Sequence, residues 1–101
     1  MNTDELISHG RARFEHAAAK RLLKEKYQGK LTFAFSGGMW SAGPELITLL
    51  RDRPEIDIVL LDLYENPVRV NVPQLRRECE QRWREQMNAW LVEYEQLNKN
   101  R

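Results

Sequence analysis

Few residues of this chain have the types and spacing that metal chemistry requires. His9 and His16 lie seven residues apart in a segment expected to be helical, so they share roughly one side of it. A zinc site needs further ligands at suitable spacing, and the nearby acids Asp4, Glu5 and Glu15 do not complete a recognisable set. We therefore expect exposed helical histidines and no bound metal.

The remaining candidates for catalysis are two acids, a serine and a thiol. Asp57 and Asp62 flank an apolar run, and their odd separation directs them to opposite faces of a strand. Ser36 has no His and Asp arranged around it as a triad. Cys79 is the only cysteine, so no intrachain disulfide is possible, and its place on an apolar helix face predicts a buried small hydrophobe. We therefore expect no catalytic residue and no cofactor, and the chain is not predicted to be an enzyme.

One loop, Phe35–Ser41 (FSGGMWS), has the composition of a phosphate cradle. It resembles the Ser-Gly-Gly-x-Asp-Ser loop of the ATP pyrophosphatase (PP-loop) family. That resemblance implies a loop between a strand and a helix, with backbone N–H groups around a pyrophosphate. Trp40 stands where the family has Asp, and Gly43-Pro44 interrupts the helix that should follow. A hairpin turn at Gly37-Gly38 explains the glycines without a ligand, and we favour that interpretation.

Length and composition predict one globular domain spanning residues 1–101, because smaller pieces would not bury a core. Hydrophobic residues make up 42% and charged residues 31%, which fits a domain with long, polar-backed helices. No segment approaches the roughly 20 apolar residues of a membrane span. The acidic N-terminal residues lack the apolar core of a secretory signal. The expected environment is cytosolic, neither secreted nor membrane-bound.

The charge is unevenly distributed, although the net charge is only +1. Residues 1–30 contain seven Lys and Arg against four Asp and Glu, for a net charge of +3. Residues 31–73 contain three against six, for a net charge of −3. The basic first segment could bind a polyanion, but a solvated helix face explains it equally simply, and we favour the helix face.

The last quarter, from Pro73 to Arg101, is predicted to form one long amphipathic helix. Its apolar positions fall within roughly 160° of the helix circumference. They are Leu75, Cys79, Trp83, Met87, Trp90, Leu91, Tyr94 and Leu97. Because each Trp or Tyr can bury about 150–250 Å², this stripe is expected to pack on the chain or on a partner. Trp83 and Trp90 are predicted to be largely buried.

A second long helix is predicted from Thr3 to Tyr27. Asn2 and Glu5 form a possible capping box, and Gly29 is the expected residue just past the end. About 24 residues give a rod of roughly 36 Å, longer than a compact core, so one end should project. The side predicted to face inward carries Leu6, Ile7, Gly10, Phe14, Ala17, Ala18 and Leu22.

Between the helices, alternating apolar residues and turn residues predict two hairpins separated by a short helix. The expected strands and helix are Leu31–Phe35, Met39–Ala42, Glu45–Arg51, Ile56–Tyr64 and Val68–Val72. Ile56–Tyr64 is the most hydrophobic run and therefore the predicted central strand. The fold class is α+β with the order α-β-β-α-β-β-α, built from a small antiparallel sheet and long terminal helices.

Three segments resemble small proteins of large contractile-tailed phages, namely the T-even-like group and its relatives that infect cyanobacteria. They are residues 29–40 (GKLTFAFSGGMW), 58–71 (IVLLDLYENPVRVN) and 86–97 (QMNAWLVEYEQL). The resemblance spans about residues 28–97 and transfers no functional residue. It implies a role in head or tail structure or assembly, in the virion or the host cytoplasm.

The sequence thus predicts a non-enzymatic structural or assembly protein that works through contacts of its helices. The expected partners are other phage structural proteins or a second copy of the chain. The predicted contact residues are Trp83, Met87, Trp90, Tyr94, Phe14 and Leu22. Two alternatives stay open: a nucleic-acid or polyanion-binding module using the basic first helix, and a degenerate nucleotide-binding protein using Ser36–Gly38. Strong salt dependence of binding would favour the first alternative, and ATP binding the second.

Overall fold

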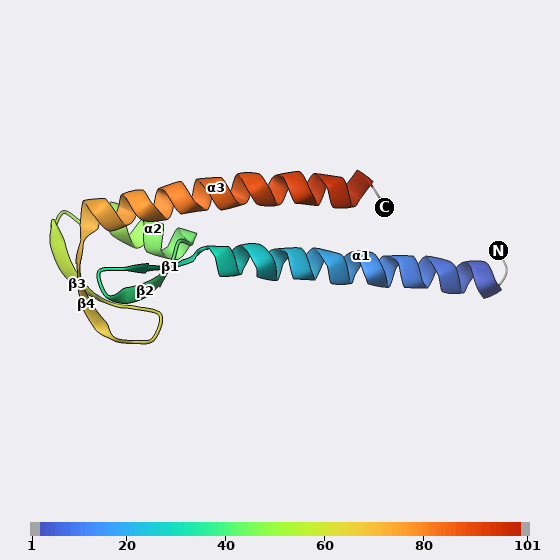
Figure 1. Cartoon of the computed structure of the whole chain (residues 1–101), viewed down its shortest axis with the longest axis horizontal. Helices are drawn as coiled ribbons and strands as arrows, with labels where there is room; N and C mark the ends of the chain where they lie inside the picture. Colours follow the sequence, from blue (N-terminus) through green and yellow to red (C-terminus); the bar gives the residue numbers. More distant parts are fainter. Residues whose placement is uncertain (1–2, 100–101) are drawn as a thin grey trace.

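The computed structural model describes residues 3–99 and confirms the predicted α+β class and the order of the elements. The elements are α1 (Thr3–Lys30), β1 (Thr32–Phe35), β2 (Gly38–Ser41), α2 (Pro44–Arg51), β3 (Asp57–Leu61), β4 (Pro67–Asn71) and α3 (Val72–Lys99). The two hairpins and α2 form a small head, from which α1 and α3 extend side by side in opposite chain directions (Figure 1). The molecule is accordingly elongated, with extents of 65 × 24 × 20 Å.

The long helix α1 continues past its predicted end at Tyr27. Gly29 lies inside the helix, so its prediction as the residue just past the end was wrong. Leu31, directly after the helix, is buried, and its carbonyl accepts a hydrogen bond from the Ala42 N–H at 2.9 Å. The helix therefore leads straight into the first hairpin, and packing in the head outweighs the weak local preference of a glycine for ending a helix. Asn2 of the predicted capping box lies outside the described residues.

The first hairpin confirms that the chain turns tightly after Phe35. β1 and β2 pair in antiparallel fashion, with Phe33 opposite Trp40. Ser36 and Gly37 occupy the two turn positions with φ of 51° and 83°, the left-handed pair that a two-residue type I′ turn requires. The turn therefore lies one residue earlier than predicted. Gly38 belongs to β2, so the strand–loop–helix arrangement of a PP-loop is not present in this segment.

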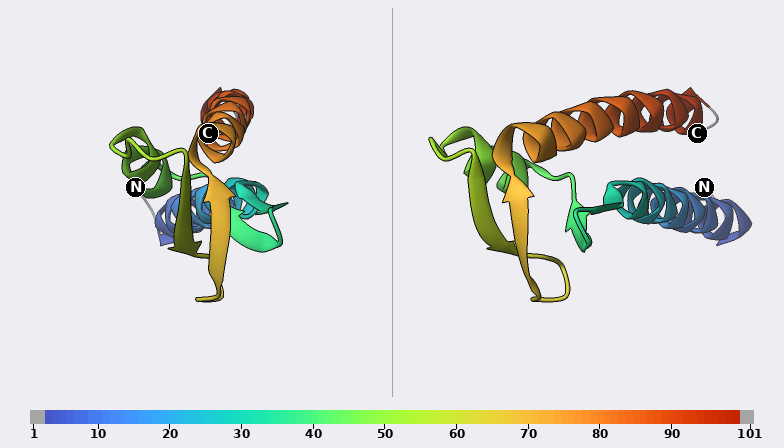
Figure 2. Two further views of the ribbon diagram at one scale, coloured as in Figure 1. Left: turned by 90° about the vertical axis from the view of Figure 1, so that its left-hand side faces the viewer. Right: turned by 60° about the vertical axis from the view of Figure 1, so that its left-hand side comes forward.

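The second hairpin, β3 and β4, forms a separate two-stranded sheet, so the prediction of one sheet was wrong. β3 alternates: Ile58 and Leu60 are half-buried against the core, whereas Val59 and Leu61 are exposed. The predicted central strand is thus covered on one face only. An apolar run of this kind is compatible with burial on both faces, but the head contributes no second layer over β3 (Figure 2).

The core lies where the two hairpins, α2 and the first turns of α3 meet. Its buried residues are Leu31, Phe33, Trp40, Ala42, Ile47, Leu50, Val70, Val72, Leu75 and Cys79. Cys79 is fully buried, as predicted, and burial raises the pKa of its thiol to about 11. The thiol is therefore protonated at neutral pH and acts as a small hydrophobic side chain.

A buried carboxylate joins the two hairpins. Asp62 accepts backbone N–H hydrogen bonds from Met39 of β2 at 3.0 Å and from Tyr64 and Asn66 of its own loop at 2.9 Å each. The Leu63 N–H also donates to the Met39 carbonyl at 2.9 Å. The N–H groups of Asn66, Met39 and Tyr64 lower the pKa of the Asp62 carboxyl below its ordinary 3.8. The role of Asp62 is therefore to hold the β3–β4 loop against β2.

We expect Asp62→Asn to lower the melting temperature most at neutral pH. A carboxyl whose pKa is lowered by folding contributes stability above its unfolded pKa and loses it as the pH falls through the folded value. The difference in melting temperature between wild type and variant should therefore shrink as the pH falls below 3.8, where the wild-type carboxyl itself becomes protonated. Thermal unfolding followed by circular dichroism from pH 7 to about pH 2 measures this difference. A pH-independent difference would contradict it, and Asp57→Asn on the exposed side of β3 is the matched control.

Candidate interaction site

The apolar stripe predicted on α3 consists of two parts. Leu75 and Cys79 are buried in the head, and Trp83 and Met87 are half-buried against the same core. Trp90, Tyr94 and Leu97 lie further along the helix and are also half-buried, and Leu91 is exposed. Trp83 and Trp90 are thus mostly covered, as predicted, but neither is fully buried. Past the head, α3 has only α1 beside it, and one helix cannot enclose a broad aromatic stripe.

An aromatic stack holds the two long helices together close to the head. The rings of Tyr27 and Trp90 are nearly parallel, with an interplanar angle of 8° and centroids 5.9 Å apart. Lys26 donates a 2.7 Å hydrogen bond to Glu93, which raises the lysine pKa and lowers the glutamate pKa. The Nζ atoms of Lys26 and Lys30 each lie 5.2 Å from the centroid of the Tyr27 ring. This seam sets the rotation and the level of α1 relative to α3.

The structure corrects the predicted inward side of α1. The side toward α3 carries His16, Ala19, Leu23 and Tyr27, all half-buried or buried. The predicted residues Ile7, Phe14 and Leu22 are 55%, 73% and 63% exposed, whereas Ala18 is half-buried as predicted. Apolar residues occur on two sides of α1, and the Tyr27–Trp90 stack selects the other side. The i,i+4 pair Leu23–Tyr27 is the sequence signal that could have identified the inner side.

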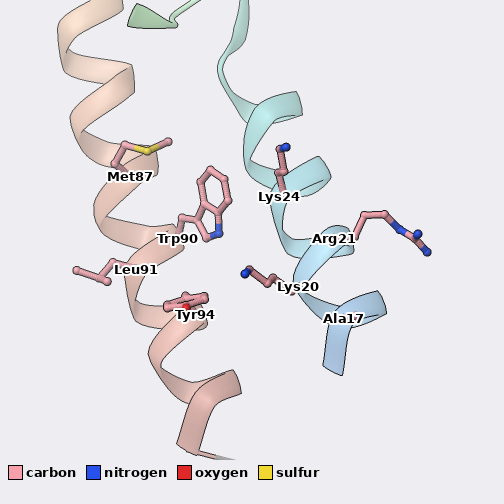
Figure 3. A pocket seen from close by; sticks show the side chains of 8 residues that line it. All are labelled: Ala17, Lys20, Arg21, Lys24, Met87, Trp90, Leu91 and Tyr94. Carbon is pink, nitrogen blue, oxygen red and sulfur yellow. The ribbon is translucent and has the colours of Figure 1, made fainter. Parts of the chain in front are cut away.

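A groove runs between the two helices beyond the stack, with a volume of about 540 Å³ (Figure 3). The α1 wall carries Ala17, Lys20, Arg21 and Lys24, and the α3 wall carries Met87, Trp90, Leu91 and Tyr94. In Figure 3, Trp90 projects across the groove toward α1, whereas Arg21 points away from α3. One wall is thus basic and the other is apolar and aromatic. In the described part of the chain, no acid forms an ion pair with Lys20, Arg21 or Lys24.

The predicted contact residues therefore lie at three separate places. Met87, Trp90 and Tyr94 line the groove. Trp83 instead lines a second pocket, between α3 and α2, together with residues such as Ile47 and Arg51. Phe14 and Leu22 lie on exposed sides of α1 and are not among the groove residues. Lys20, Arg21 and Lys24 were predicted only as part of a general basic cluster. Their place in the groove depends on the rotation of α1.

Among residues 3–99, no three or more His, Cys, Asp or Glu side chains gather in a way that could hold a metal ion. His9 is exposed and His16 is half-buried, both on α1. Within the same residues, no helix combines the length and apolar character needed to cross a membrane.

Comparison with known proteins finds no matching family model, no matching curated protein and no matching solved structure.

Proposed function

We propose that this chain is a non-enzymatic structural or assembly protein that works through protein–protein contacts of α1 and α3. One observation carries the proposal: two 28-residue helices extend from a small core and leave apolar surface uncovered. Ile7, Phe14 and Leu22 are mostly exposed along α1. A helix with apolar residues in water on its outer side is typical of a surface that a partner covers.

The resemblance to small proteins of contractile-tailed phages supplies the setting of this proposal. In that setting the chain is a component or assembly factor of the phage head or tail. An extended helical hairpin suits such a role, because it presents a long surface to neighbouring subunits while the head remains a separate packed unit.

Polyanion binding is the second candidate, and the basic wall of the groove favours it. Lys20 and Lys24 lie across the groove from the aromatic ring of Trp90, and proteins use this combination of cations and aromatic rings to bind single-stranded nucleic acids. Acidic residues on α3, including Glu93 and Glu95, oppose it. The turn at Ser36-Gly37 lends no support to the nucleotide-binding alternative.

Mass spectrometry of purified particles and assembly intermediates of the encoding phage tests the proposal. We expect the wild-type chain in one of these fractions and expect Phe14→Glu to be lost from it, because a charge would be buried at the contact. Gln96→Glu, which adds a charge at an exposed polar position of α3, is the matched control and should be retained. Absence of the wild-type chain from every fraction, or equal retention of Phe14→Glu, would contradict the proposal.

A further inference from the structure

Side chains of opposite charge lie beside the groove on the two helices. Lys20, Arg21 and Lys24 line the α1 side. On α3, Glu95 follows the groove residue Leu91 by four positions and therefore lies on the same side of the helix, where it is exposed. One chain thus carries both a basic strip and an apolar strip ending in an acid.

We propose that a second copy of this chain covers the groove, so that the overlapping parts of the two helical hairpins form a short four-helix bundle with two-fold symmetry. This inference rests on the proposed function and names the partner of its contact surface. The two-fold axis runs parallel to the helices, and α1 of each copy packs beside α3 of the other. Lys24 and Arg21 of one copy then face Glu95 of the second copy, and Leu91 closes the apolar centre.

The helix levels within one copy support this pairing. The Lys26–Glu93 ion pair places these two residues at the same height along the hairpin. Lys24 lies two residues before Lys26, and Glu95 lies two residues after Glu93. Because the helices are antiparallel, both steps move about 3 Å in the same direction. A two-fold axis along the bundle preserves height, so Lys24 and the second copy's Glu95 lie at the same level.

The face that the two helices share is limited to the stretch where they overlap, because α1 projects past the end of α3 and α3 begins within the head (Figure 1). At its centre, Met87, Trp90 and Leu91 supply the apolar surface that is removed from water.

Other occupants would respond differently to a charge reversal. An acidic amphipathic helix or a nucleic acid would also use Lys20, Arg21 and Lys24, but it would be repelled by Glu95. Glu95→Lys should therefore strengthen the binding of such a ligand, whereas it should weaken a dimer in which Glu95 faces cations of the second copy. The sign of the effect separates the two classes of occupant.

Sedimentation equilibrium of the purified full chain at micromolar concentrations tests the proposal. We expect a dimer, with Glu95→Lys or Lys24→Glu each raising the dissociation constant about ten-fold or more, because symmetry places two like-charge pairs in every dimer. The double variant Lys24→Glu/Glu95→Lys should restore most of the wild-type affinity. Glu85→Lys makes the same charge change on α3 away from the groove and should leave the affinity unchanged. Far-UV circular dichroism verifies that all variants retain the wild-type helical content.

Three outcomes would overturn the inference. They are a monomer at all concentrations, equal weakening by Glu95→Lys and Glu85→Lys, and a double variant that remains weak. Tighter binding of an acidic peptide or an oligonucleotide to Glu95→Lys, with no dimer, would also overturn it and assign the groove to that ligand. A monomeric chain that is still recovered in phage particles would leave the proposed function standing. A chain that dimerises but is absent from every particle fraction would support the dimer and contradict the proposed function.

Discussion

Replacing Trp40 with alanine should lower the free energy of unfolding by about 3–5 kcal/mol, the range for a fully buried aromatic side chain. Trp40 is 2% exposed and pairs with Phe33 across the first hairpin. Its indole Nε1 donates a 2.9 Å hydrogen bond to the Phe35 carbonyl, so the ring also holds the end of β1. The substitution leaves a cavity and removes the partner of that carbonyl.

Urea denaturation followed by far-UV circular dichroism measures this loss. Trp40→Phe is the matched variant, because it keeps an aromatic ring but cannot donate to Phe35, and it should cost clearly less than the alanine change. Equal stability of wild type and Trp40→Ala would show that Trp40 is not part of the core. It would also reopen a functional role for the loop in which Trp40 occupies the position of the PP-loop aspartate.

Leu75→Ala should cost about 2–5 kcal/mol, because Leu75 is 0% exposed at the point where α3 enters the head. The core around it contains Leu50 of α2 and Cys79 one turn further along α3. Loss of the side chain leaves a cavity in a small core that has few other residues to fill it. Anchoring of α3 to the head therefore depends strongly on this residue.

Val92→Ala on the same helix is the matched control for Leu75→Ala. Val92 is exposed, and alanine has the higher helix propensity. Val92→Ala should therefore change the free energy of unfolding by less than about 0.5 kcal/mol. Thermal and urea unfolding of both variants test the contrast. Similar losses at the two positions would mean that the outer part of α3 is packed as tightly as its base, which would contradict the division of the helix into a core part and an open part.

The sequence by itself determined the kind and order of the elements, because the responsible signals act over a few residues. The glycines after Phe35 indicated the first hairpin turn, although it forms at Ser36 and Gly37, one residue earlier than predicted, and Pro44 stands at the first position of α2. The apolar spacing from Leu75 to Leu97 identified the covered side of α3, with the exception of Leu91, which is exposed. The burial of Cys79 followed from its place in that same spacing.

Only the tertiary structure decided which sides of these elements are covered. α1 has apolar residues on two sides, and its own sequence does not select between Phe14 and Tyr27. The selection comes from Trp90, which is distant in the chain and stacks on Tyr27. β3 has an apolar run compatible with two covered faces, but no other element lies over Val59. The local sequence pattern determines which face of a segment prefers to be buried. Whether that face is covered depends on the other elements that pack against it.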